Sequence, residues 1–236
     1  MSKQIELLSG FANEPAIAGW DREPEDNEQF HIANQMFEHG DAELWFHVIN
    51  HFKPARIIEI GSGHSTKVAR MALAHLKTAE PHFNCEHICI EPHGPVWLKQ
   101  LGPHVIEERV ENVAPEFFLQ LEKNDILFID SSHMIRPQGD VLFEIMQILP
   151  TLAHGVIVHF HDIFTPRDYP DEWLKERVYF WNEQYLLEAF LSSNREWEIL
   201  LAANMLMHDN FELLKSKCRY LDRRNEPRSF YIRRLG

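Results

Sequence analysis

The chain has 236 residues, which is enough for one ordinary domain built on a buried sheet. Hydrophobic residues make up 44% and charged residues 25%, which is the balance of a globular protein and not of a disordered or membrane chain. With 36 acidic against 23 basic residues, the net charge of −13 repels phosphate backbones and argues against a nucleic-acid partner.

The sequence carries no sign of a membrane segment or an export signal. No apolar run approaches the roughly 20 residues of a membrane-spanning helix, and the start of the chain lacks the basic and apolar regions of a signal peptide. The three cysteines are too few for a disulfide framework. We therefore expect a cytoplasmic protein without a membrane partner.

The N-terminal part differs from the rest of the chain in its periodicity. Residues 1–40 show no strong period and contain the acidic run 21–28. Asp41 then caps a predicted helix over 42–52, in which apolar residues recur at helical spacing. This pattern predicts an extension and helix over 1–53 that cover the functional site, followed by the main domain over 54–236.

From Pro54 onward, short apolar runs alternate with helical stretches. Strands are predicted over 55–60, 86–91, 104–110, 125–130 and 155–160, and helices over 65–77, 95–101, 115–121 and 140–149. Such alternation predicts an α/β fold with a doubly wound parallel sheet, which binds ligands at the carboxyl ends of its strands. A long helix over 173–193 and two late strands over 197–202 and 229–234 indicate an antiparallel addition at the sheet edge.

A glycine-containing loop follows the first predicted strand. Gly61 and Gly63 allow a sharp turn and a close approach to a ligand, and Glu59 just before them can accept a hydrogen bond from a cationic amino-acid ligand. A tight strand-to-helix turn is the plain alternative, because Thr66 replaces the third glycine of a dinucleotide-binding loop. Glu91 ends the next strand, where a carboxylate can bind the two hydroxyls of a ribose.

Acidic and histidine side chains gather at the ends of the fourth and fifth predicted strands; they are Asp130, His133, His159, His161 and Asp162. Strand alternation puts His159 and His161 on one face and Asp162 on the other, unless the strand ends before His161. Oxygen and imidazole ligands suit Mg²⁺ or Mn²⁺ among other divalent cations. The histidines can also simply hydrogen-bond the carboxylates, so a metal or acid–base role and a structural role both stay open.

In this order, the segments IIEIGSGHST, LFIDSSH and VHFHDIF resemble class I S-adenosylmethionine-dependent methyltransferases, over about residues 57–234. The resemblance implies a seven-stranded Rossmann-like sheet in the order 3-2-1-4-5-7-6 with an antiparallel last strand, a methyltransferase domain over 54–236, and S-adenosylmethionine as cofactor. Within the family, the sequence looks like the small-molecule O-methyltransferase branch. A bacterial group with FIDSSH, HFHDIF and WNEQYLL signatures is the most similar.

The resemblance also implies roles for individual residues. The methionine moiety would be held by Glu59, Gly61 and Gly63, the ribose by Glu91, and the adenine by Glu111 or Asn112. Ser62, Ser65 and Asp130 would also contact the cofactor. Asp130 and Asp162 would orient an acceptor hydroxyl, and His133 stands where catechol-type enzymes carry a catalytic lysine. Asp130, His161 and Asp162 would hold a divalent cation; here Ile163 replaces the asparagine that follows the aspartate in those enzymes.

Two other functions compete with this interpretation. His133, His161 and Asp162 are the residue types of the facial triad in metal-dependent oxygenases, although an oxygenase would not require the Glu59–Gly63 loop and Glu91. A non-catalytic binding module on the same fold is the second alternative. The expected partner is a small-molecule acceptor of unspecified identity, and the sequence leaves homo-oligomerisation open.

Overall fold

The structure is a computed structural model that describes residues 1–12 and 15–236; residues 13 and 14 of the predicted extension lie outside the described residues. Its centre is a seven-stranded sheet in the order β3-β2-β1-β4-β5-β7-β6. β7 runs antiparallel to both of its neighbours, and the other strand pairs are parallel. The predicted doubly wound α/β sheet, its strand order and its antiparallel last strand are therefore confirmed.

The strands are short. They are β1 Arg56–Ile60, β2 Glu86–Ile90, β3 His104–Ile106, β4 Ile126–Ile129, β5 Ile157–Phe160, β6 Trp197–Ala202 and β7 Phe230–Arg234. The α-helices are α1 Ser2–Gly10, α2 Asp41–Phe52, α3 His64–Ala79, α4 Asp140–Phe143, α5 Asp171–Lys175, α6 Glu183–Leu191, α7 Ala203–Asp209 and α8 Phe211–Lys217. Between them lie the 3₁₀ helices η1 Pro15–Ile17, η2 Val96–Leu101, η3 Val110–Asn112, η4 Pro115–Gln120 and η6 Leu149–Thr151, and the π-helical turn η5 Glu144–Ile148.

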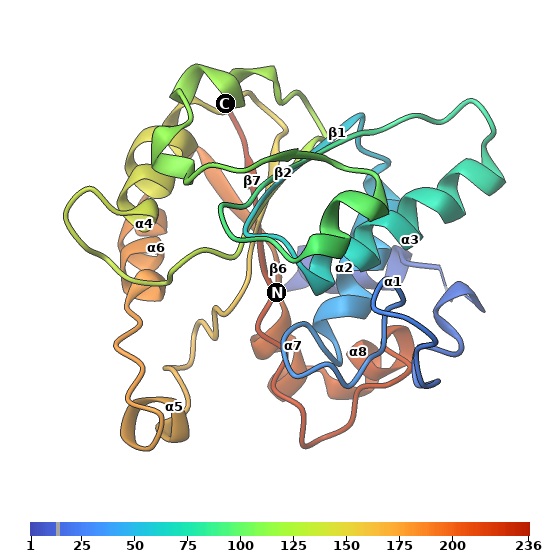
Figure 1. The fold of residues 1–236 in the computed structure, drawn as a ribbon. Coiled ribbons are helices and arrows are strands. Elements are labelled where there is room, and N and C mark those ends of the chain that lie inside the picture. Colours follow the sequence, from blue (N-terminus) through green and yellow to red (C-terminus); the bar gives the residue numbers. More distant parts are fainter. Residues whose placement is uncertain (13–14) are drawn as a thin grey trace.

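Helices cover both faces of the sheet, and strand alternation decides which residues each face buries. On one side, Ile57 of β1 packs in a core shared with α1, α2, α3, α7 and α8. On the other side, Ile58 and Ile60 pack with η4, α4 and α6. Figure 1 shows these two helical layers, with α5 projecting away from the sheet. No helix of the described residues combines the length and the apolarity that a membrane crossing requires.

The predicted helix over 173–193 is wrong, because two short helices, α5 and α6, occupy this stretch. Val178 adopts a positive φ of 56°, which breaks the helix. The backbone N–H groups of Asn182 and Glu183 then donate to the carbonyl oxygen of His133, at 2.9 and 3.2 Å, and not to carbonyls one turn earlier. A long-range contact therefore replaces the local helical bonds at this point.

Four other elements differ from the predictions. The third strand stops at Ile106, where its pairing with β2 ends, and not at residue 110. The predicted helices over 95–101 and 115–121 are the 3₁₀ helices η2 and η4. The sequence also missed α1, since its core-facing Gln4 interrupts the apolar period; the Gln4 side chain accepts a hydrogen bond from Ala202 N at 2.9 Å.

Candidate active site

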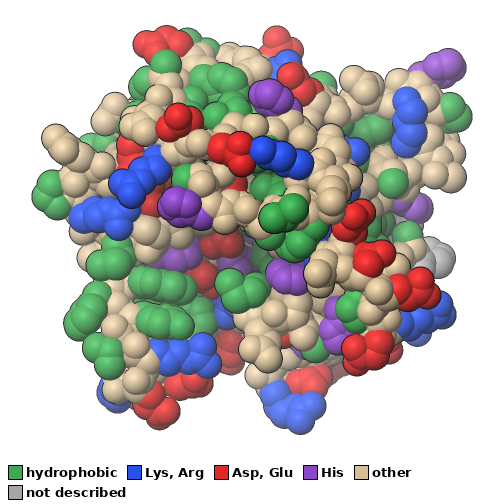
Figure 2. Space-filling view, in the orientation of Figure 1, with side chains coloured by type: hydrophobic (Ala, Val, Ile, Leu, Met, Phe, Trp, Pro, Cys, Tyr) green, Lys and Arg blue, Asp and Glu red, His purple; other side chains and the backbone are tan. Residues whose placement is uncertain are grey.

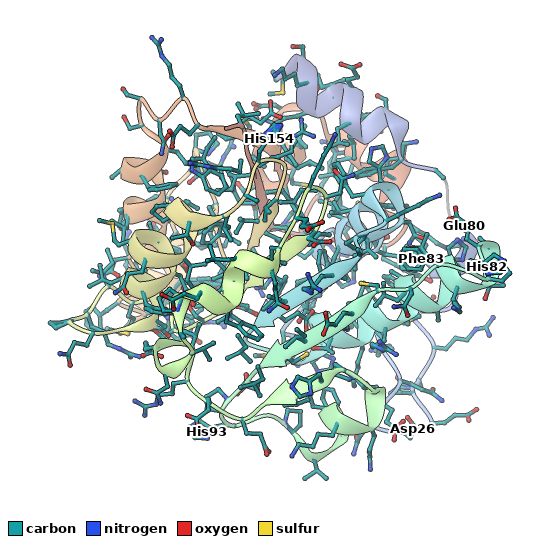
Figure 3. The ribbon with its side chains drawn as sticks, turned by 90° about the horizontal axis from the view of Figure 1, so that it is seen from above. Asp26, Glu80, His82, Phe83, His93 and His154 are labelled. Carbon is teal, nitrogen blue, oxygen red and sulfur yellow. The ribbon has the colours of Figure 1, made fainter. Side chains whose placement is uncertain are left out.

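A cavity of about 310 Å³ opens where β1, β2 and β4 end. This is the sheet edge that the doubly wound topology assigns to ligands. Its lining consists of Ile60, Gly61, Ile90, Glu91, Pro92, His93, Arg109, Val110, Glu111, Asp130, Ser131, Arg136 and Asp140. In Figure 3, His93 lies beyond the arrowheads of the parallel strands, and His154, just before β5, lies on the opposite side.

Gly61 allows the ends of β1 and β4 to approach each other. Its φ is +77°, and its N–H donates to the carbonyl oxygen of Ile90 at 3.1 Å. A Cβ atom built on Gly61 would lie 1.9 Å from the carbonyl oxygen of Asp130. Both the torsion angle and the contact therefore require glycine at this position.

Glu91 presents its carboxylate to the cavity and is held there by the backbone. One oxygen accepts a hydrogen bond from Ser62 N at 3.2 Å, and the other accepts from His93 N at 2.8 Å. An ionised carboxylate offers about four acceptor positions, so Glu91 keeps capacity for two further donors such as a pair of hydroxyls.

Asp130 joins the cavity to a second group of polar side chains around His133. The Nε2 atom of His133 lies 3.2 Å from Asp130 Oδ1 and 3.3 Å from Asp162 Oδ2, and its Nδ1 atom lies 2.8 Å from Glu183 Oε2. The ring of Trp181 packs against the His133 ring, with 4.3 Å between centroids. The Asp130 side chain is 32% exposed and that of His133 only 6%, so a ligand in the cavity meets Asp130 first.

The end of β5 brings His161 and Asp162 to the same group. β5 ends at Phe160, and Asp162 has a positive φ of 59°, so the loop turns both side chains toward Asp130. His161 Nδ1 lies 3.5 Å from Asp130 Oδ1 and 3.6 Å from Asp162 Oδ1. The strand thus ends before His161, which is the exception to strand alternation that the sequence analysis allowed.

Residues 58–163 match the family model described as a methyltransferase domain. The match covers just under half of the chain, from β1 to the loop after β5. The chain is also 29% identical over 133 residues to an uncharacterized protein of Archaeoglobus fulgidus; the match covers 52% of this chain and 56% of that protein. The chain thus spans about half the length of the curated relative it matches.

Two solved structures resemble the whole chain. A TDP-rhamnose 3'-O-methyltransferase of calicheamicin biosynthesis has a TM-score of 0.52 at 13% identity, with 98% of this chain and 93% of that chain covered. This likeness establishes the fold alone. An O-methyltransferase from Bacillus cereus in complex with SAH has a TM-score of 0.48 at 10% identity, with 100% of this chain and 91% of that chain covered.

The residues predicted to bind the cofactor fall into two groups. Four of them line the cavity; they are Gly61, Glu91, Glu111 and Asp130. The others lie outside its lining; they are Glu59, Ser62, Gly63, Ser65 and Asn112. Glu59 is fully buried on the opposite face of β1, where its carboxylate accepts a hydrogen bond from the hydroxyl of Thr66 at 2.5 Å.

Neighbouring charges and hydrogen bonds shift the pKa values of Asp130, His133 and His161 toward their charged forms. Burial by itself would lower the pKa of His133, but hydrogen bonds to Asp130 and Glu183 and the charge of Asp162 outweigh it and raise the pKa well above its ordinary value. Burial acts likewise on His161, yet the charges of Asp162 and Asp130 raise its pKa to about 10. Burial would raise the pKa of Asp130, and the two imidazoles lower it instead. The site is therefore a network of carboxylate–imidazolium pairs.

The geometry fits a divalent cation held by the predicted set. One ligand atom each of Asp130, His161 and Asp162 lies within 4.8 Å of the others, and neither ring nitrogen of His161 has a hydrogen-bond partner among the described residues. Ile163 packs in the core and offers no ligand, so His161, once deprotonated, would be the third donor. Arg228 competes for the site, because its Nε lies 2.6 Å from Asp162 Oδ1.

His159 stands apart from this group. Its ring stacks on Tyr231 with 4.0 Å between centroids and packs against Phe128 and Trp45. Burial lowers its pKa well below the ordinary value, so it is a neutral core histidine.

Sequence reasoning missed three residues that complete the site. Glu183 binds His133, Arg228 pairs with Asp162, and Asp41 accepts hydrogen bonds from the backbone N–H groups of Arg228 and Ser229 at 2.8 and 2.7 Å. Asp41 also lies 3.6 Å from His161 Nε2. Only the WNEQYLL signature, which contains Glu183, pointed to any of them.

A second cavity, of about 260 Å³, lies beyond Asp41 and Arg228. Besides these two residues it is lined by Glu38, His39, Phe164, Pro170, Glu172, Trp173, Arg224, Asn225 and Glu226. Arg228 contacts both Asp162 and the face of the Trp173 ring, so this cavity adjoins the polar network. In Figure 2, acidic and histidine side chains are visible in a recess beside the lobe that carries α5.

Proposed function

We propose that the protein transfers a methyl group from S-adenosylmethionine to a hydroxyl group of a small polar acceptor. The observation that carries this proposal is the position of Asp130, which lines the first cavity and also lies 3.2 Å from His133. A methyl donor in the first cavity and an acceptor at the polar network would therefore meet at one carboxylate. Holding two reactants at such a distance supplies much of the acceleration in methyl transfer.

The first cavity has the features that the methyl donor needs. Glu91 has free acceptor positions for the two ribose hydroxyls, and Glu111, which lines the same cavity, is the residue we assign to the adenine. Gly61 keeps the loop close to the sheet edge, and the negative charge of Asp130 favours a sulfonium nearby. We infer that these four residues hold the donor.

The second cavity is the best candidate for the acceptor. Its volume of about 260 Å³ suits one sugar ring or a substituted phenol. Carboxylates, two arginines and the Trp173 ring line it, a mixture that favours a polar molecule with several hydrogen-bonding groups. Nucleic acids and membranes do not enter this proposal, and the cytoplasmic location stays a prediction.

His133 is the group we assign to remove the acceptor's proton. Its Nδ1 hydrogen-bonds Glu183, which leaves Nε2 directed at the Asp130 and Asp162 carboxylates. With the charges of Asp130 and Asp162 taken up by a bound cation, the pKa of His133 would fall and its Nε2 would be neutral. An acceptor hydroxyl beside it would then lose its proton to Nε2 as its oxygen forms the new bond to carbon and the carbon–sulfur bond breaks. A divalent cation on Asp130, His161 and Asp162 would make that hydroxyl more acidic.

Calorimetry with S-adenosylhomocysteine, followed by an acceptor screen with labelled methyl donor, tests the proposal. We expect wild-type protein to bind S-adenosylhomocysteine and to label at least one small hydroxyl compound. His133→Ala should lose turnover by about 100-fold or more and keep its affinity for S-adenosylhomocysteine within a few fold. Failure of the wild type to bind the cofactor product would reject the proposal, and full turnover in His133→Ala would reject the role of His133.

The same cluster argues against the oxygenase alternative. The ligand atoms that converge belong to Asp130, His161 and Asp162, and this set holds only one imidazole. His133 is engaged by Glu183 on one nitrogen and by two carboxylates at the other. Iron-dependent turnover with 2-oxoglutarate would nevertheless favour the oxygenase.

A further inference from the structure

A second group of metal-ligating side chains lies inside the domain, away from both cavities. It consists of Glu59 on β1 and of His87 and Cys89 on β2. Glu59 is paired with Cys89 in the parallel register, and His87 lies two residues before Cys89, so all three point to the same face of the sheet. Glu59 and Cys89 have no exposed surface, and His87 is 4% exposed.

The ligand atoms are spaced like the corners of a tetrahedral site. His87 Nε2 and Cys89 Sγ each lie 3.5 Å from Glu59 Oε2, and they are 3.9 Å from each other. A zinc ion with bonds of about 2.0 Å to nitrogen or oxygen and about 2.3 Å to sulfur separates its ligands by roughly 3.3–3.6 Å. Movements of a few tenths of an ångström would therefore bring the three atoms into contact with one ion.

Two buried polar atoms of the group point to a missing partner. Glu59 Oε1 and His87 Nδ1 have no hydrogen-bond partner among the described residues. Leaving a carboxylate oxygen buried and unpaired is costly, so such atoms require an explanation. Coordination of Glu59 through both oxygens would satisfy Oε1 and supply the fourth donor of a closed site.

We propose that Glu59, His87 and Cys89 bind a structural Zn²⁺ ion. A thiolate, an imidazole and a carboxylate together select zinc over Mg²⁺ or Ca²⁺, which prefer oxygen ligands alone. The charges also balance: one thiolate and one carboxylate neutralise the two positive charges of the ion, so the site as a whole can be buried without net charge. Binding would release the thiol proton to solvent.

The ion would connect the sheet to the glycine loop of the first cavity. Thr66 donates its hydroxyl hydrogen to Glu59 and accepts a hydrogen bond from Gly63 N at 3.1 Å. Fixing Glu59 on a metal therefore fixes Thr66 and, through it, the start of α3. The proposal does not depend on the acceptor or on His133, so it can fail while the proposed function holds.

The decisive experiment uses Co²⁺ as a spectroscopic substitute for Zn²⁺. Because all three ligands are buried, the ion should enter during folding, so the protein is expressed in minimal medium with either Zn²⁺ or Co²⁺. We expect about one ion per chain by elemental mass spectrometry, and a thiolate-to-cobalt charge-transfer band in the near ultraviolet. The Asp130 cluster has no thiolate ligand, so it cannot produce this band.

Cys89→Ser and the control Cys85→Ser separate the site from other cysteines. Cys85 lies just before β2 and is not part of the group. We expect the band to persist in Cys85→Ser and to fall at least tenfold in Cys89→Ser, with His87→Gln as a second test should Cys89→Ser not fold. Natively folded wild type without the band, or an unchanged band in both Cys89→Ser and His87→Gln, would overturn the proposal.

Discussion

At the scale of single residues, positions 61 and 63 of the same loop are glycine for different structural reasons. Gly61 has a positive φ and no room for a Cβ, because the Asp130 carbonyl oxygen would be 1.9 Å away. Gly63 has an extended φ of 178°, and a Cβ there would meet no atom of the described residues within 4 Å. Neither its φ nor a steric contact therefore requires glycine at this position, and we predict that the missing Cβ serves the approach of a ligand.

Alanine at each position separates these two reasons. We expect Gly61→Ala to lower the free energy of unfolding by roughly 3 kcal/mol, because backbone must move to admit the methyl group. Gly63→Ala should unfold within about 0.5 kcal/mol of the wild type and bind S-adenosylhomocysteine about tenfold more weakly. Denaturant unfolding and calorimetry measure both effects. Unchanged affinity in Gly63→Ala would show that the ligand does not approach this residue.

Glu183 is expected to act through His133, and Gln at this position tests it. The carboxylate holds Nδ1 of His133 at 2.8 Å, and glutamine keeps the size of the side chain but removes its charge. We expect Glu183→Gln to lower kcat by about 10- to 100-fold and to leave the binding of S-adenosylhomocysteine unchanged. Glu188→Gln, on the same helix but contacting Thr165 and Gln184, is the matched control. Equal kcat values in the two variants would remove Glu183 from the mechanism.

At the scale of elements, α2 carries a buried acid whose titration should be visible in stability. Burial raises the pKa of Glu43 to about 7 from its ordinary value of 4.5, although hydrogen bonds from the N–H groups of Tyr220 and Gly40 oppose the rise. Between these pH values the folded chain keeps a proton that the unfolded chain releases. The free energy of unfolding should therefore fall as pH rises from 4.5 to 7, by up to about 1.4 kcal/mol per pH unit, and level off above pH 7.

The variant Glu43→Gln removes this titration. Its free energy of unfolding, measured by denaturant titration at several pH values, should lack the part of the slope that Glu43 contributes. A slope identical to that of the wild type across the same range would show that Glu43 is ionised throughout in the folded protein.

The elements also show what the sequence can and cannot specify. Strands β1, β2, β4 and β5 were predictable because each is a short apolar run between helical stretches, and their carboxyl ends placed Gly61, Glu91 and Asp130 at one edge. The break between α5 and α6 was not, because the backbone of residues 182–183 bonds to His133, about 50 residues earlier. Local periodicity carries no information about such contacts.

Long-range contacts are also the reason why part of the candidate site could not be predicted from the sequence. Arg228 pairs with Asp162, which lies 66 residues earlier in the chain, and its backbone N–H donates to Asp41, 187 residues earlier. No sequence pattern connects residues that are so far apart. Four other arginines of the C-terminal segment pair with carboxylates outside the candidate site; they are Arg223, Arg224, Arg233 and Arg234. Only the fold distinguishes Arg228, which reaches Asp162, from these neighbours in the sequence.

At the scale of the whole molecule, the sheet topology and not the cavity volume favours one cavity as the cofactor site. A groove of about 410 Å³ between α1 and β6 is larger than the cavity of about 310 Å³ at the ends of β1, β2 and β4. The larger groove lies at the edge of the sheet, lined by Lys3, Leu7, His51, Ile199 and Arg233 among others. It adjoins neither Glu91 nor the polar network around Asp130, so it offers no continuous path for methyl transfer.

Hydrogen exchange with and without S-adenosylhomocysteine tests this assignment across the molecule. Saturating ligand should slow amide exchange in residues 61–63, 91–93, 109–112 and 130–132, which line the cavity of about 310 Å³ or directly follow its lining residues in the chain. Residues 3–10 and 198–200, beside the larger groove, should exchange at the same rate in both states. A subsequently added acceptor should protect 38–41 and 170–173, since these line the second cavity beyond Arg228. Protection confined to α1 and β6 would place the ligand in the wrong cavity for the proposed chemistry, because Glu91 and Asp130 would then both be out of its reach.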